Sequence, residues 1–198
     1  MIKENKKIIT GKKTVHILIK TAKVLFAQNG YTNTHMEQVA NLARVSRGAL
    51  YHHFKFKKKL FEAVLEEILA DIYVQMTKSI RACNNPWDKL LIGSRTFLKA
   101  ATHPAAEQIF IIDAAGVLGE EKLRKIDENY TVSILKNVLI ELEKGLNLSS
   151  INVDVLAEAI YGASQQCAIW VANAKDSKKA LIEANATLEL LYSSLKKV

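Results

Sequence analysis

Residues 31–61, YTNTHMEQVANLARVSRGALYHHFKFKKKLF, constrain the fold of this chain more than any other stretch. Apolar residues recur at helical spacing in two short segments on either side of a turn at residues 42–45, and a longer helical pattern begins at Lys57. Ser46 is a favoured N-cap for the second short helix, which extends to about Phe54. Two short helices around a tight turn, the second of them exposed, are the layout of a helix-turn-helix.

A further helix is expected before this stretch. Apolar residues on one face predict a helix over residues 14–29, with Gly30 at the left-handed position that follows a helix end. Tyr31 would then fall back against Phe26. Residues 1–13 are polar and rich in lysine, and we expect them to form a mobile arm.

The start of the first short helix has two alternatives. Thr34 and Glu37 have the spacing of a capping box, which favours a start at Thr34. A start one residue later, with His35 as the cap, is nearly as compatible with the pattern. In either case the buried face is predicted to be Met36, Val39, Ala40 and Ala43.

The second short helix has the residues that a groove-binding helix needs. Gly48 and Ala49 are small and lie near its start, and a helical glycine costs about 1 kcal/mol relative to alanine, which suggests close approach to a partner. Arg47 is long enough to bind guanine O6 and N7 in bidentate fashion. Tyr51, His53 and Lys57 are placed to bind phosphates. An ordinary packing unit with an exposed cationic end is the alternative.

Charge is concentrated toward the N-terminus. Residues 1–60 contain 13 lysines and arginines against two acids, Glu4 and Glu37, for a net charge of +11. The other residues carry 15 basic and 18 acidic side chains, for a net charge of −3. A basic end on a slightly acidic body is typical of a polyanion-binding protein, although a solvated lysine face would give the same composition.

The remainder of the chain predicts an all-α protein of about nine helices, because 198 residues contain only 2 Pro and 8 Gly. We expect two domains: an arm with the helix-turn-helix at residues 1–56, and a helical regulatory domain at residues 57–198. The helix that starts at Lys57 extends to about residue 82 and joins them without a linker. Further helices are predicted over residues 86–102, 120–144, 153–173 and 177–196, with a short helix opening at Pro104 and a buried apolar stretch at residues 108–118.

Two of these helices have the pattern of a helix-pair interface. Residues 177–196 place apolar side chains at alternating spacings of three and four, at Leu181, Ala184, Leu188, Leu191 and Leu195. Residues 153–173 offer small side chains for close approach, among them Ala159 and Ala163. We expect these stripes to form a dimer interface; packing within one protomer is the alternative.

The segments LFAQNGY, T-x-x-x-x-V-A and VSRGALYHHFKFKKKLF resemble the N-terminal domain of TetR-family transcriptional regulators over roughly residues 15–65. The resemblance implies base contacts from the start of the second short helix and phosphate contacts around it. With their neighbours on the same surface, the implicated residues are Thr34, His35, Met36, Arg44, Ser46, Arg47, Gly48, Ala49, Tyr51, His52, His53 and Lys57. The chain departs from the family at Arg44, where glycine is usual, and at His35 and Met36, where small hydroxyl or β-branched residues are common.

A fainter resemblance links FLKAATHPAAEQIFIIDAAGVLG and EEKLRKIDENY to TetR-family ligand domains, which usually bind a small, often apolar molecule between their helices. Asp113 is the most unusual residue there, because an unpaired buried carboxylate is costly. It would pair with Arg95 or Arg124, or face a polar group of the ligand. The predicted pocket residues are Met76, Phe97, His103, Phe110, Asp113, Tyr130, Ile160, Gln166 and Trp170, and each aromatic among them also suits a simple core role.

These observations predict a homodimeric, cytoplasmic repressor that binds a palindromic double-stranded DNA operator and is released by a small-molecule effector. A helical adaptor or ligand-binding protein whose basic end binds a protein or an acidic membrane surface is the alternative. The five histidines show no metal-binding spacing, and there is no Gly-rich phosphate loop or nucleophile motif, so no enzyme activity, cofactor or metal is expected. No apolar run is long enough to span a membrane. Cys167 is either a structural thiol or a redox sensor.

Overall fold

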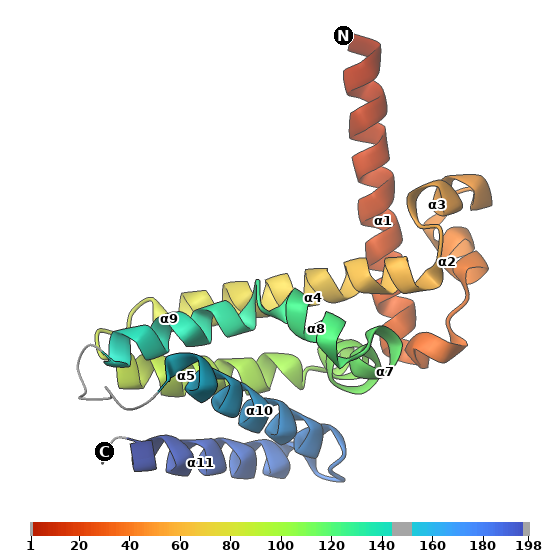
Figure 1. Cartoon of the computed structure of the whole chain (residues 1–198). Coiled ribbons are helices and arrows are strands. Elements are labelled where there is room, and N and C mark those ends of the chain that lie inside the picture. Colours follow the sequence, from red (N-terminus) through yellow and green to blue (C-terminus); the bar gives the residue numbers. More distant parts are fainter. Residues whose placement is uncertain (1, 144–151, 196–198) are drawn as a thin grey trace.

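The computed structural model describes residues 2–143 and 152–195, and every regular element in those ranges is a helix. Figure 1 shows a long N-terminal helix standing across one end of a layered helical body, with two short helices beside it. In the described part of the chain, no helix is both long and apolar enough to cross a membrane. The predicted all-α fold is therefore confirmed, with more and shorter helical segments than expected.

Helix α1 extends over Ile2–Asn33 and is interrupted only at Gly30, which has φ 72° and ψ 173°. The expected mobile arm is therefore wrong: residues 2–13 continue the helix, which is consistent with the absence of proline and the number of lysines in that segment. The break at Gly30 confirms the predicted helix end. Tyr31 stacks on Phe26 with ring centroids 5.9 Å apart, also as predicted.

Helices α2 (Met36–Ala43) and α3 (Arg47–His53) form the helix-turn-helix. The N-cap of α2 is His35, whose backbone N–H donates to the side chain of Gln38. The start at Thr34 is wrong because the Thr34 hydroxyl is used elsewhere: it donates to the backbone carbonyl of Gly30 at 2.8 Å. The Ser46 hydroxyl accepts a hydrogen bond from the Ala49 N–H, so the predicted cap of α3 is confirmed.

Helix α4 (Lys57–Ile80) connects the helix-turn-helix to the body. Its core-facing side is buried from Leu60 to Met76, first against α1 and then against α5 (Pro86–Ala101). The side chain of Asn85 caps α5 by accepting from the Trp87 N–H. Because α4 packs on both parts of the chain, a shift of its body end would be transmitted to the helix-turn-helix.

The apolar stretch after α5 forms three short consecutive elements: α6 (Pro104–Ala106), a π-helix η1 (Glu107–Asp113) and α7 (Ala114–Leu118). Ile109 and Phe110 are buried, but Ile112 is 51% exposed, so the expectation of burial on nearly every face is wrong. A π-helical turn widens the helix by one residue per turn and is often found at functional positions. Here η1 packs against α1.

The helix expected over residues 120–144 is two helices, α8 (Glu120–Asp127) and α9 (Thr131–Glu143). The break occurs because the Asp127 carboxylate accepts hydrogen bonds from both the backbone N–H and the hydroxyl of Thr131, which starts α9 anew. The predicted end of this helix near residue 144 lies outside the described residues. Helices α10 (Val153–Ala172) and α11 (Ser177–Leu195) follow as expected and pack on each other and on α5.

Candidate nucleic-acid interface and effector cavity

The start of α3 presents an open surface. The Arg47 side chain is 71% exposed, and Gly48 is exposed with no heavy atom within 4 Å of the position that a Cβ would occupy. Packing within the described chain therefore does not require glycine at this position. Glycine weakens a helix, so its presence here is consistent with a partner that approaches the α3 backbone closely, where a side chain would intervene.

A carboxylate on α2 holds two donors of this surface. The same Glu37 oxygen lies 3.2 Å from the Arg47 guanidinium and 3.2 Å from the Tyr51 hydroxyl, which donates to it. The guanidinium also lies over the Tyr51 ring, 5.6 Å from its centroid. A hydrogen bond from its own backbone, together with the Tyr51 hydroxyl and the Arg47 charge, lowers the pKa of Glu37, so the carboxylate is ionised at neutral pH.

Lys57 is directed into the protein. Its ammonium donates to the carbonyl oxygens of Tyr31 at 2.8 Å, Thr34 at 3.0 Å and Thr32 at 3.3 Å, and it lies 4.2 Å from the centroid of the Tyr31 ring. Burial lowers the pKa of Lys57 from its ordinary value. All three N–H donors are therefore engaged within the chain, and in this conformation Lys57 fastens the start of α4 to the end of α1.

The other predicted DNA-contact residues fall into two groups. The side chains of Thr34 and Met36 are buried, so the structure contradicts their assignment to the surface: Thr34 ties the end of α1 and Met36 packs in the core. Arg44 has φ 53° and ψ 39°, the left-handed conformation expected where the family has glycine, at a cost of about 1 kcal/mol. His35, Arg44, Ser46 and His52 are exposed, whereas Ala49, Tyr51 and His53 are half-buried.

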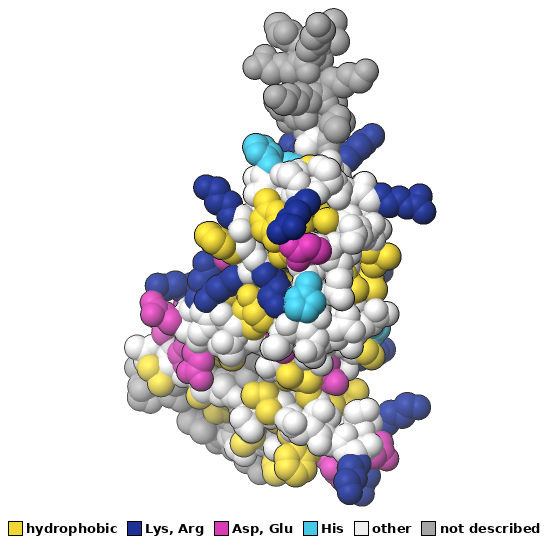
Figure 2. Space-filling view, turned by 90° about the vertical axis from the view of Figure 1, so that its right-hand side faces the viewer, with side chains coloured by type: hydrophobic (Ala, Val, Ile, Leu, Met, Phe, Trp, Pro, Cys, Tyr) yellow, Lys and Arg dark blue, Asp and Glu magenta, His cyan; other side chains and the backbone are white. Residues whose placement is uncertain are grey.

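Figure 2 shows the side of the molecule that carries these elements. Below the grey tip, lysine, arginine and histidine side chains are scattered over its upper and middle part, with acidic side chains near the centre and at the left edge. Glu37 is the acidic residue that the helix-turn-helix contributes, and it is already paired. This surface therefore has the charge that a phosphate backbone requires.

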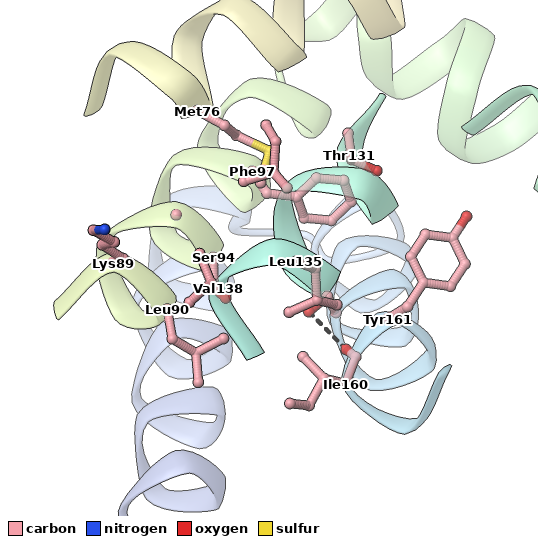
Figure 3. Close-up of a pocket in the computed structure, with 13 residues that line it drawn as sticks. Met76, Lys89, Leu90, Ser94, Phe97, Thr131, Leu135, Val138, Ile160 and Tyr161 are labelled. Atoms are coloured by element: carbon pink, nitrogen blue, oxygen red, sulfur yellow. Dashed lines mark hydrogen bonds between the residues drawn. The ribbon is translucent and has the colours of Figure 1, made fainter. Parts of the chain in front are cut away.

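The body contains a mainly apolar cavity between α4, α5, α9 and α10, shown in Figure 3. Its volume, measured at the centre of a water-sized sphere, is about 40 Å³, which is enough for a few water molecules. A larger molecule would have to widen the cavity. Met76, Phe97 and Ile160 line the cavity as predicted. Sequence reasoning missed further residues, although several repeat at helical spacing: Leu90, Ser94, Thr131, Ile134, Leu135, Val138, Tyr161 and Ser164.

The structure removes six predicted residues from this cavity. Trp170 is 63% exposed and Gln166 is exposed, because both lie on the outer face of α10. Phe110 is buried behind Phe97, with ring centroids 6.3 Å apart. The remaining three are elsewhere: His103 and Tyr130 line separate surface depressions, and Asp113 faces α1.

A buried polar cluster adjoins the cavity. Asp127 is fully buried, and one of its oxygens accepts from Thr131 while the other has no hydrogen-bond partner among the described residues. Burial raises the pKa of Asp127, an effect that the Thr131 hydrogen bonds, the nearby Tyr161 hydroxyl and the Arg124 charge only partly offset. Arg124 lies over the Tyr161 ring at 4.6 Å from its centroid and pairs with Glu158. Because Thr131 and Tyr161 also line the cavity, the cluster provides its polar end.

Asp113 joins the body to the helix-turn-helix. Its carboxylate accepts a hydrogen bond from the Tyr31 N–H at 2.8 Å. Neither predicted arginine partner is available: Arg95 pairs with Glu189, and Arg124 with Glu158. A Cβ on Gly30 would lie in ordinary van der Waals contact with Gln108 at 3.4 Å and Asp113 at 3.6 Å, so the φ of 72° rather than lack of space favours glycine here.

The predicted dimer stripe is partly an internal packing surface. Ala184 and Leu188 are buried within the chain, because this face of α11 packs on α10 and α5, so they cannot form an interface with a second copy. Leu181, Leu195 and Ala163 are half-buried, whereas Ala159 and Leu191 are exposed. The large apolar side chains exposed on the outer faces of the two helices are Val155, Ile169, Trp170, Ile182, Leu190 and Leu191.

The chain has a basic helix-turn-helix that one helix joins to a helical body with an internal cavity. This arrangement defines a helix-turn-helix transcriptional regulator. Two family models match the chain: "Bacterial regulatory proteins, tetR family" over residues 18–64, and "Tetracyclin repressor-like, C-terminal domain" over residues 87–195. The second covers more than half of the chain, so the protein belongs to the TetR family.

Curated relatives and solved structures agree with this assignment. The Tn10 TetC protein of Escherichia coli is 27% identical over 167 residues, which cover 83% of each chain. The fatty acid metabolism regulator protein of Bacillus subtilis is 27% identical over 184 residues, 90% of this chain and 93% of the relative. A TetR-family regulator from Pectobacterium atrosepticum is 29% identical with a TM-score of 0.77, and the aligned region covers 92% of this chain and 94% of that one.

Proposed function

We propose that this protein is a homodimeric, cytoplasmic repressor that binds a near-palindromic operator and is released by a small, mostly apolar effector. Residues 1–56 would bind DNA, and residues 57–198 would bind the effector and a second copy. The observation that carries the proposal is the exposed start of α3, where Arg47 and Gly48 stand on a basic surface that α4 connects to an apolar cavity. No catalytic role is proposed.

DNA binding would place α3 in the major groove. Arg47 would leave Glu37 for a base edge, while Tyr51 and the exposed His52 would bind the flanking phosphates. The left-handed Arg44 lies in the turn and is exposed, so its guanidinium would reach the same strand.

A second copy would dock on the outer faces of α10 and α11. Val155, Ile169 and Trp170 on α10 and Ile182 and Leu190 on α11 are each 38–71% exposed, and they lie opposite the faces that pack on each other. A patch of large apolar side chains at helical spacing is typical of a subunit interface. Two recognition helices related by a two-fold axis require a near-palindromic operator with half-sites about one helical turn apart or somewhat more.

The effector would enter the cavity at Phe97 and Met76, with a hydrogen-bonding group directed at Thr131 or Tyr161. Two proteins of the same fold have been solved with ligands of different size: the FadR regulator of Bacillus subtilis with stearoyl-CoA (21% identity, TM-score 0.73) and RolR with resorcinol (17% identity, TM-score 0.69). The cavity of this chain would have to widen for a ligand of either size, less for the smaller kind, and separation of α5 from α9 would provide that space.

Effector binding would reach the DNA-binding surface by two packed routes. Met76 of α4 lines the cavity, and the other end of α4 is fastened to α1 through Lys57. Phe97 also lines the cavity and packs on Phe110 of η1, whose last residue, Asp113, binds the Tyr31 N–H. An effector that prefers the released conformation by a few kcal/mol is sufficient to dissociate DNA.

Selection of duplexes from a random-sequence library, followed by gel shifts at increasing salt, tests the proposal. We expect one near-palindromic sequence to be enriched and its affinity to fall steeply with salt. Arg47→Ala should lose about 1–3 kcal/mol of discrimination at one position of each half-site. Equal affinity for every duplex, or binding to none, would show that the protein does not act as a sequence-specific repressor.

A further inference from the structure

Phe56 occupies an unusual position at the start of α4. It is the N-cap residue, with φ −138° and ψ 147°, and its side chain makes no capping hydrogen bond. Its ring is 66% exposed, and a phenylalanine side chain has no atom that could cap the helix. Three other helices have capping side chains, Ser46 at α3, Asn85 at α5 and Asn152 at α10, whereas α6 and α8 also start without one. With Phe56 at this position, the start of α4 lacks a side-chain cap and an apolar ring is exposed to solvent.

The ring is flanked by positive charge that nothing in the described chain neutralises. Lys55 and Lys58 are exposed, and neither forms an ion pair with a described residue. Lys59 differs because it pairs with Glu62 at 3.0 Å, and Lys57 is directed inward. An exposed aromatic ring between two free ammonium groups is complementary to a polyanion that also offers apolar surface, which a nucleic-acid backbone does through its sugars.

The position of Phe56 in the chain sets what it would meet. Only Phe54, which is buried, and Lys55 separate it from the end of α3. Helix α3 has 7 residues, or roughly 10 Å of length, and the major groove is about 12 Å wide. With the start of α3 at the base edges, the segment that follows its last turn arrives at the wall of the groove. In Figure 1 a short connection leads from α3 to the nearby start of α4.

We infer that Phe56 packs against a deoxyribose of the DNA strand bordering the major groove, with Lys55 and Lys58 on the phosphates beside that sugar. This inference rests on the proposed function. The contact adds affinity without sequence preference, because every nucleotide presents the same sugar. It also accounts for an aromatic residue at a position where a hydroxyl or amide side chain would stabilise the helix.

Phe56→Ser provides a test in which the two effects have opposite signs. Serine supplies the missing cap oxygen, so we expect the melting temperature to stay equal or rise. It also removes the ring, so we expect affinity to fall about fivefold, both for the duplex selected by the wild-type protein and for a scrambled duplex. The dependence of log affinity on log salt should not change, since no charge is removed. Phe56→Tyr keeps the ring and should retain wild-type affinity.

Val74→Ser is the matched control, because Val74 is 61% exposed on the same helix at its body end. We expect it to leave DNA affinity unchanged. If Phe56→Ser binds the selected duplex as tightly as the wild type, the inference is wrong while the proposed function stands. The inference is also wrong if Phe56→Ser loses binding only to phosphatidylserine vesicles, because the ring would then belong to a membrane-binding surface. If the wild-type protein selects no duplex, both the inference and the proposed function are wrong.

Discussion

The carboxylate of Glu37 on α2 and the guanidinium of Arg47 on α3 form an ion pair across the helix-turn-helix, 3.2 Å apart, on the surface proposed to face DNA. The same oxygen holds the Tyr51 hydroxyl. Glu37 therefore occupies two donors until a base or a phosphate displaces it, and its own charge repels the DNA backbone wherever no specific contact compensates for it.

Glu37→Gln should weaken the preference of the protein for the selected duplex over a scrambled duplex. Glutamine keeps an acceptor for Tyr51 but removes the charge, so we expect affinity for a scrambled duplex to rise about three- to tenfold at low salt, and affinity for the selected duplex to rise less. Fluorescence anisotropy with both duplexes measures the ratio. Glu141→Gln is the control, because Glu141 pairs with Lys89 on the body. An unchanged ratio in Glu37→Gln would contradict this role.

Lys57→Met should destabilise the protein as well as weaken DNA binding. It leaves three carbonyl oxygens at the end of α1 without their donor, which costs roughly 1–2 kcal/mol and about 3–8 °C in melting temperature. Thermal unfolding followed by circular dichroism measures the change. Lys58→Met serves as the control, since Lys58 is exposed, and should not lower the melting temperature. If Lys57→Met lost DNA binding at unchanged stability, a direct phosphate contact would be the better account.

Asp113→Ala should loosen the backbone at Tyr31, where the Asp113 carboxylate holds the end of α1. Loss of a charged, partly buried acceptor is expected to raise hydrogen exchange at the Tyr31 amide about tenfold. Site-resolved exchange by NMR measures this directly, and Ile112→Ala, at an exposed neighbouring position, is the control. Unchanged exchange at Tyr31 would mean that η1 does not hold this backbone in solution.

Trp170→Glu should convert the proposed dimer to a monomer. A carboxylate at the centre of an apolar interface would be left without a partner, and the expected mass by light scattering is then 22.1 kDa. Affinity for the selected duplex should fall at least about a hundredfold, because each half-site would bind alone. Val74→Glu introduces the same charge at another exposed position and should leave the mass unchanged. A dimeric Trp170→Glu protein would place the interface elsewhere.

Asp127 should make stability depend on pH in an unusual direction. Burial raises the pKa of this carboxyl in the folded state, so between the ordinary value near 3.8 and the raised value the folded protein binds more protons than the unfolded chain. The stability of the wild type should therefore decline as pH rises through this window. Asp127→Asn, which does not titrate, should lack that part of the slope. Urea unfolding of both proteins from pH 4 upward measures the difference; parallel slopes would contradict the assignment.

Much of the fold was predictable because it depends on local signals. The Ser46 cap, the Gly30 break and the apolar periodicity of α4, α10 and α11 act within a few residues of each other along the chain. The division of α8 from α9 was not predictable, because it depends on a carboxylate that caps the next helix from a fully buried position. The π-helical turn of η1 left no signal in the apolar pattern.

The candidate site divides in the same way. Arg47, Gly48 and Tyr51 were predicted as surface residues from their type and place on α3, and the structure exposes Arg47 and Gly48 and leaves Tyr51 half-buried. The cavity was predicted less well. Trp170 and Gln166 were assigned to it from their chemistry, and the rotation of α10 in the body turns both outward.

By itself, the sequence determined that this chain is helical, that residues 31–61 form a basic helix-turn-helix, and that one uninterrupted helix leads from it into the body. Periodicity, caps and charge are properties of neighbouring residues, so they do not depend on the rest of the fold. Tertiary structure alone decided which side chains are free to act. It turned Lys57 inward, paired Arg47 with Glu37, gave Asp113 to the backbone of Tyr31 and left Phe56 exposed. Each of these depends on contacts between segments far apart in the chain or on the packing of whole helices, which sequence spacing does not encode.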